Sequence, residues 1–195
     1  MPRMLATIGV VGVVATFAIA FGGVVDWGLP GTSEYATYAL INRLTGVALA
    51  LVVAAPLSLW RALAGKDKAG GVRRSLVVVA VALGGMVVGS VAEFWVFNDQ
   101  PYQGAGGEGR NVAWMTFLLS GLAVVAGSVA TGILLMRGAF VPLWAGAAVA
   151  SAAPLGIAAA TRGASATIVV PLVGLALCVT TLALARRRPV SFRIS

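Results

Sequence analysis

The chain has 195 residues, of which 59% are hydrophobic and only 10% are charged. Soluble domains are about 45–50% apolar and about 25% charged, so this composition argues for a membrane protein and against a soluble one. The chain has one cysteine and no histidine, which excludes an intrachain disulfide, histidine-ligated haem or zinc, and a Ser-His-Asp triad.

The chain divides into apolar segments that are separated by short polar stretches rich in glycine and proline. A spanning helix needs about 20 apolar residues, and six segments meet this length. They cover about residues 4–25, 36–63, 75–97, 112–136, 140–160 and 165–185. The longest polar stretch, residues 98–111, is too short for a folded domain. The sequence therefore predicts an all-α polytopic transmembrane bundle, a single membrane domain over residues 1–195 without a soluble domain.

The first apolar segment has a second interpretation. Residues 1–20 have a basic start, an apolar centre and the pattern Ala18-x-Ala20, as secretory signal peptides do. Cleavage there would leave five helices. We expect the segment to be retained, because its apolar run continues to Val25 and is long enough to span.

Basic residues set the expected orientation. On the six-helix prediction, one side of the membrane carries Arg3, Arg61, Lys66, Lys68, Arg73, Arg74, Arg137, Arg186, Arg187, Arg188 and Arg193. Only Arg110 and Arg162 fall on the other side. Cytoplasmic loops are enriched in lysine and arginine, so both termini are predicted to be cytoplasmic and the membrane to be the cell membrane. This distribution, rather than binding to nucleic acid, explains the net charge of +8.

Acidic residues gather on the predicted outer side. They are Asp26, Glu34, Asp99 and Glu108. Such an acidic rim could attract cations or dock a partner. The favoured interpretation is that acidic residues are tolerated where basic residues are excluded.

Two ionisable residues, Arg43 and Glu93, fall inside predicted spanning segments, where charges are costly and often functional. At 1.5 Å per residue, Arg43 lies roughly 30 Å from the cytoplasmic end of its helix at Leu63. Glu93 lies roughly 27 Å from Ser75, the corresponding end of the next helix. Two antiparallel neighbours would therefore place both charges at similar depth, so the sequence predicts that Arg43 and Glu93 pair.

Small residues suggest which helix faces meet. Gly85, Gly89 and Glu93 are spaced four apart and share one face, and Asn42 and Gly46 do the same on the preceding helix. If these faces meet, Asn42, Arg43 and Glu93 form an intramembrane polar cluster. It could be a structural pair that fixes helix register, which we favour, or a site where Glu93 titrates or binds a cation.

The expected function is that of a non-catalytic subunit or scaffold of a membrane assembly. The alternative is a small ion or solute transporter that uses Glu93, paired with Arg43, at its outer mouth. An enzyme is the least supported class, because no nucleophile–base pair and no metal-ligand spacing is visible. A flavin, quinone or chlorophyll can bind without a readable motif, so no cofactor is assigned. The expected partners are membrane lipids and either another membrane protein or further copies of the chain.

Overall fold

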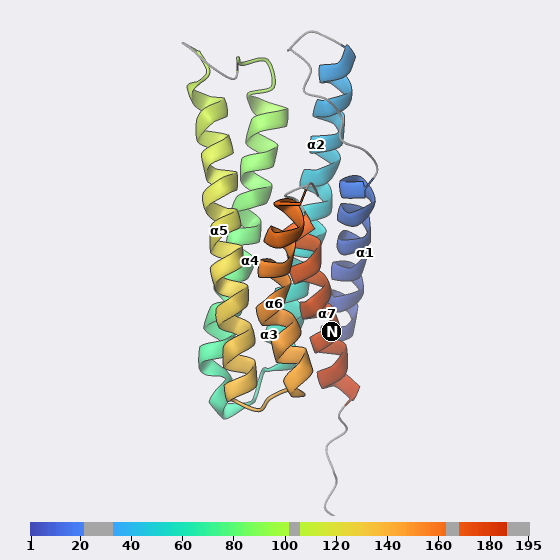
Figure 1. Ribbon diagram of the computed structural model, residues 1–195, viewed down its shortest axis with the longest axis vertical. Coiled ribbons are helices and arrows are strands. Elements are labelled where there is room, and N and C mark those ends of the chain that lie inside the picture. The colour runs from blue at the N-terminus through green and yellow to red at the C-terminus, as the bar shows by residue number, and fades with distance from the viewer. Residues whose placement is uncertain (22–32, 102–105, 163–167, 187–195) are drawn as a thin grey trace, which may run out of the picture.

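The computed structural model describes residues 1–21, 33–101, 106–162 and 168–186, and this part of the chain consists of helices joined by turns, without strands (Figure 1). Six of its helical stretches are long and apolar enough to cross a membrane. In chain order the elements are α1 (Pro2–Phe21), α2 (Ser33–Val52), α3 (Ala54–Ala62), the 3-10 turn η1 (Asp67–Ala69), α4 (Gly70–Val91), the π-helical turn η2 (Ala92–Val96), α5 (Glu108–Arg137), α6 (Leu143–Ala160) and α7 (Val169–Arg186). The expected all-α architecture with six long apolar helices is confirmed.

The second predicted segment is divided into two helices. Helix α2 ends at Val52 and α3 begins at Ala54, although the two together form one apolar stretch from Ser33 to Ala62. Pro56 accounts for the interruption, because proline has no N–H to donate to the carbonyl of Val52 and its ring crowds that carbonyl. The backbone N–H of Val53 still bonds to Leu49, so the chain continues in nearly the same direction.

The core runs through the middle of the bundle. Leu49, Leu59, Leu83, Leu135 and Leu177, from five different helices, are all at most 1% exposed. Glycines let the backbones approach closely at several crossings. At Gly132 of α5, an added Cβ would collide with the backbone of α6, so a larger residue could not occupy this crossing.

The helices differ in length, and this shapes one end of the molecule. Helix α1, α6 and α7 each contribute stretches of 18 or 19 residues, whereas Ser33–Ala62 and α5 have 30 each and Gly70–Val96 has 27. In Figure 1, α2, α4 and α5 extend well beyond α1, α6 and α7 at the top. We call this region, built from the start of α2, from η2 and from the start of α5, the three-helix end. It has its own small apolar cluster of Tyr35, Ala39 and Phe94, with Tyr38 packed against it.

The opposite end, which we call the basic end, gathers the start of α1, the α3–α4 and α5–α6 connections and the end of α7 (Figure 1). The guanidinium of Arg3 donates to the carbonyl of Ala185 over 3.5 Å, which joins the first helix to the last. The described basic residues of this end are Arg3, Arg61, Lys66, Lys68, Arg73, Arg74, Arg137 and Arg186. Arg187, Arg188 and Arg193 lie outside the described residues.

Candidate functional site: a buried charge cluster at the three-helix end

Glu93 is buried, and its ion-pair partner is Arg110. The Glu93 Oε1 atom lies 3.8 Å from the Arg110 Nε atom, and the two side chains are only 6% and 1% exposed. Glu93 projects from η2 and Arg110 from the first turn of α5. Two opposite charges are thus held together away from water, where each alone would be costly.

The prediction that Glu93 pairs with Arg43 is wrong. The Nε atom of Arg43 donates instead to the backbone carbonyl of Phe94 over 2.8 Å, and its guanidinium lies 5.6 Å from the centre of the Trp95 ring. Within the described part of the chain, no ion pair joins Arg43 to Glu93. Arg43 thus contacts the same turn as Glu93 but satisfies a carbonyl at a helix end rather than the carboxylate.

The packing of α4 explains why Glu93 pairs with Arg110 rather than with Arg43. A Cβ at Gly89 would lie 2.8 Å from the Ala113 carbonyl and from the Phe117 amide, both on α5, and a Cβ at Gly85 would collide with Ser120 of α5. The face that carries Gly85, Gly89 and Glu93 therefore packs against α5 and not against α2.

Helix α2 meets a different face of α4. A Cβ at Gly46 would lie 3.0 Å from the Ser90 hydroxyl, and that hydroxyl donates to the carbonyl of Asn42 over 3.3 Å. The Asn42 amide donates to the Tyr38 carbonyl of its own helix over 2.9 Å. Gly46 thus packs against Ser90 rather than against the Gly85–Gly89 face, while Asn42 serves the α2–α4 contact through its backbone rather than contributing its side chain to the charge pair.

Arg110 connects all three helices of this end. One guanidinium nitrogen donates to the Tyr35 hydroxyl of α2 over 2.6 Å. The other donates to the carbonyls of Gln100 and Asn98, which follow η2, over 2.8 and 3.4 Å. The Tyr35 hydroxyl in turn donates to the Asn98 carbonyl over 2.8 Å. This network engages both terminal nitrogens of the guanidinium, as a buried cation requires.

Aromatic rings cover the charge pair. The guanidinium carbon of Arg110 lies 5.4 Å from the centre of the Tyr35 ring and 5.9 Å from that of Phe94. Tyr38 packs edge-on against Phe94 at 5.6 Å between ring centres. The rings exclude water and add cation–π attraction, so the pair sits in a dry, aromatic-walled site.

A π-helical turn positions Glu93. In η2 the Phe97 amide bonds to the Ala92 carbonyl, five residues earlier, over 2.9 Å. The wider turn places Glu93 and Phe94 inside, while Trp95 is 58% exposed. Single π-helical turns within α-helices are rare and are frequent at functional sites. This turn is the second feature, besides burial, that sets Glu93 apart.

The described members of the predicted acidic rim lie at the surface, whereas Glu93 and Arg110 are buried. Asp26 lies outside the described residues. Glu34, Asp99 and Glu108 are exposed, and the last two accept local bonds of 3.3 Å from the Asn98 amide and the Gly106 backbone N–H. Among the residues described, no three His, Cys, Asp or Glu side chains gather as metal ligands. A role of the rim in cation attraction or docking stays a prediction.

Arg110 and Tyr35 are the site residues that sequence reasoning missed. Arg110 was expected in the outer loop, as an exception to the charge distribution. That exception was the available signal: a basic residue beside the start of an apolar segment, on the side where basic residues are otherwise scarce, needs a specific reason to be there.

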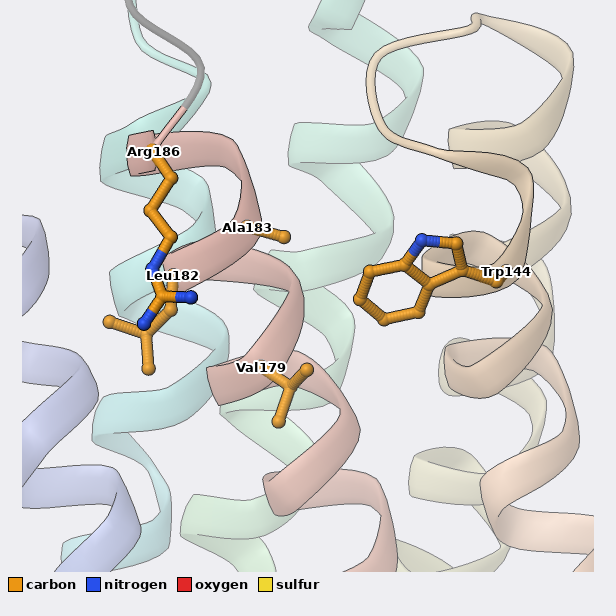
Figure 2. Close-up of a pocket in the computed structure, with 5 residues that line it drawn as sticks. All are labelled: Trp144, Val179, Leu182, Ala183 and Arg186. Atoms are coloured by element: carbon orange, nitrogen blue, oxygen red, sulfur yellow. The ribbon is translucent and has the colours of Figure 1, made fainter.

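Two cavities lie at the basic end, remote from the charge cluster. One, of about 410 Å³, is lined by Trp144 of α6 and by Val179, Leu182, Ala183 and Arg186 of α7 (Figure 2). The other, of about 280 Å³, is lined by Trp60, Gly70, Arg73, Arg74 and Val77.

Comparisons with protein-family models, with curated proteins and with solved structures found no match to this chain.

Proposed function

We propose that the chain is a small integral membrane protein that acts as a non-catalytic subunit or scaffold of a membrane assembly. Its six long apolar helices would span the cell membrane, with the basic end and both termini in the cytoplasm. The three-helix end, with exposed Trp95 and Trp114, would then lie at the outer interface, where tryptophan is enriched.

The observation that carries the proposal is the internal use of the buried charges. Glu93 is paired, and Arg110 bonds to Tyr35 and to two backbone carbonyls. A binding or proton-transfer site presents polar atoms to a ligand or to water, whereas here Glu93 forms an ion pair with Arg110 and the terminal nitrogens of Arg110 donate to atoms of α2 and of the segment after η2. The cluster is therefore suited to fixing the arrangement of α2, α4 and α5.

A stripe on α5 supports contact with a partner helix. Val112, Met115, Leu119 and Leu122 are all exposed and are spaced three or four residues apart, so they form one apolar seam along the helix. The seam begins at the three-helix end, beside the site that holds that end together. A transmembrane helix of another subunit, or of a second copy, could pack along it.

Native mass spectrometry tests this proposal. The tagged protein, purified from its own membranes in a mild detergent, should retain a second chain, and Leu119→Trp should weaken that association by introducing a bulky side chain into the seam. Leu143→Trp is the matched control, because Leu143 of α6 is also exposed but lies outside the seam. This variant should leave the complex intact. A wild-type protein that is monomeric under all mild conditions would contradict the scaffold function.

A second candidate function is transport through Glu93, now paired with Arg110 rather than Arg43. The π-helical turn at Glu93 favours it, because such turns often mark functional sites. Flux of protons or small cations into proteoliposomes should then require Glu93 and be lost in Glu93→Gln. A flux with this dependence would replace the scaffold function, and its absence would remove the transport candidate.

A further inference from the structure

The smaller cavity at the basic end combines two arginines with an aromatic ring and an apolar side chain. It has a volume of about 280 Å³ and is lined by Trp60 of α3 and by Gly70, Arg73, Arg74 and Val77 of α4. The guanidinium of Arg73 lies 4.3 Å from the centre of the Trp60 ring, and that of Arg61 lies 5.3 Å from it. Stacking on the ring restrains the Arg73 guanidinium, so its donors are preorganised for a planar or tetrahedral anion.

The positive charge of this cavity is not neutralised by the surrounding described residues. Among the described side chains, which do not include that of Asp67, none forms an ion pair with Arg73 or Arg74, and the buried Nε atom of Arg73 has no hydrogen-bond acceptor. In the sequence, residues 64–74 carry four basic residues against one acidic residue, Asp67.

The start of α4 adds to this positive potential. The first turn of α4 has no acidic residue, and its N-cap residue Ala69 makes no side-chain capping bond. A helix N-terminus carries partial positive charge, so basic side chains are unfavourable there unless an anion is close by. A bound phosphate group would therefore interact favourably with the guanidiniums and with the helix end at once.

An apolar stripe leads away from the cavity along the same helix. Val77, in the cavity wall, is followed by exposed Val78 and Val81 toward the middle of α4. A ligand with a charged head and a hydrocarbon chain would match both parts. The cavity in Figure 2 differs, because it has a single arginine, Arg186, beside a mainly apolar wall.

We propose that the Trp60–Arg73–Arg74 cavity is a binding site for an anionic phospholipid, with the headgroup phosphodiester on the two arginines and an acyl chain along Val77 and Val81. The inference rests on the proposed membrane location, with the basic end facing the anionic cytoplasmic leaflet. It does not depend on whether the protein is a scaffold or a transporter.

Native mass spectrometry with defined lipids tests the site. The detergent-purified protein is titrated with phosphatidylglycerol or with phosphatidylcholine of identical acyl chains. Phosphatidylglycerol should bind more tightly, and R73Q/R74Q should weaken its binding about fivefold for each arginine removed, or about 25-fold in all. R73K/R74K keeps the charge but loses the planar donor geometry. Its affinity for phosphatidylglycerol should therefore fall between those of the wild type and R73Q/R74Q.

The control variant R137Q/R186Q removes the same charge from the same end, outside the cavity, and should keep most of the affinity. An equal loss in this control, or equal binding of the two lipids, would overturn the site. Displacement of the lipid by millimolar inorganic phosphate would also overturn it, since the cavity would then bind free phosphate. Extraction of the protein from membranes by alkaline carbonate would instead contradict the proposed membrane location, which distinguishes the two failures.

Discussion

A buried cation that forms an ion pair with a carboxylate and donates hydrogen bonds to a hydroxyl and two carbonyls has different energetics from a cation at a surface. Arg110 is among the largest fully buried side chains of the described residues, and the atoms it contacts come from α2 and from residues 93–100. Removing one member of such a network leaves others buried without partners, which costs more than the lost bond itself. Arg43 is only half-buried and bonds to one carbonyl, so its removal should cost less.

Arg110→Ala should therefore destabilise the protein by about 3–5 kcal/mol, because it strands Glu93 in a dry site. Arg43→Ala should cost about 1.5–3 kcal/mol, the value of one charged hydrogen bond. Unfolding in mixed detergent micelles, followed by circular dichroism, measures both. Equal stability of the two variants would contradict the assignment of Arg110 as the partner of Glu93.

The same pair can be tested by replacing both charges. The double variant R110M/E93L should be more stable than Arg110→Ala alone, because two apolar side chains of similar size leave no uncompensated charge. A double-mutant cycle with the single variants R110M and E93L should give a coupling energy of about 1–3 kcal/mol. Strict additivity would mean that the two side chains do not interact.

The Tyr35 hydroxyl is a smaller part of the network. Tyr35→Phe removes one bond to Arg110 and one to Asn98 and should cost about 1–3 kcal/mol in the free energy of unfolding. Thr37→Val, on the same helix, removes an exposed hydroxyl that bonds to the local backbone and should cost well under 1 kcal/mol. The same unfolding assay compares the two, and a Tyr35→Phe variant as stable as the control would place the hydroxyl outside the network.

At the scale of elements, the sequence predicted where the long helices lie along the chain, but it did not predict correctly which helices pack against each other. Apolar runs and turn residues identified six long helices because both signals are local. The four-residue spacing of Gly85, Gly89 and Glu93 correctly placed these residues on one face. It could not say which neighbour that face meets, because α4 packs against both α2 and α5. Nothing in the composition of residues 92–96 indicated a π-helical turn, and only Pro56 hinted at the break between α2 and α3.

Neighbouring glycines of α4 provide a matched test of the α4–α5 contact. Gly89→Ala should destabilise the protein by about 1–3 kcal/mol, because its Cβ would lie 2.8 Å from the backbone of α5. Gly84→Ala, where no atom lies within 4 Å of the new Cβ, should stabilise the helix by up to about 1 kcal/mol. Changes of the same sign in both variants would contradict the observed packing of this face.

At the scale of the whole molecule, the clearest pattern is the separation of the basic end from the three-helix end. The buried pair lies at one end and the arginine-lined cavities at the other, with an apolar core between them. The positions of the basic residues along the sequence indicated this separation. The number and order of the helices alone assign each connection, and the basic residues in it, to one end.

Orientation can be measured with single cysteines. Cys178 is fully buried, so in a Cys178→Ala background the variants Glu108→Cys and Lys68→Cys each present one exposed thiol. In intact cells, a membrane-impermeant maleimide should label position 108 and leave position 68 unlabelled until the cells are permeabilised. The reverse pattern would place the basic end outside.

The unequal helix lengths have a mechanical consequence for a surrounding bilayer. At 1.5 Å per residue, Ser33–Ala62 and α5 measure about 45 Å, whereas α6 and α7 measure about 27 Å. A hydrocarbon core of about 30 Å matches the short helices and is too thin for the long ones. In a bilayer, lipid beside α2 and α5 would thicken, or those helices would tilt or project their polar ends into water, while lipid beside α6 and α7 would be undisturbed. The protein would therefore act as a wedge that creates a thickness gradient around itself and favours neighbours whose own spans match its taller side.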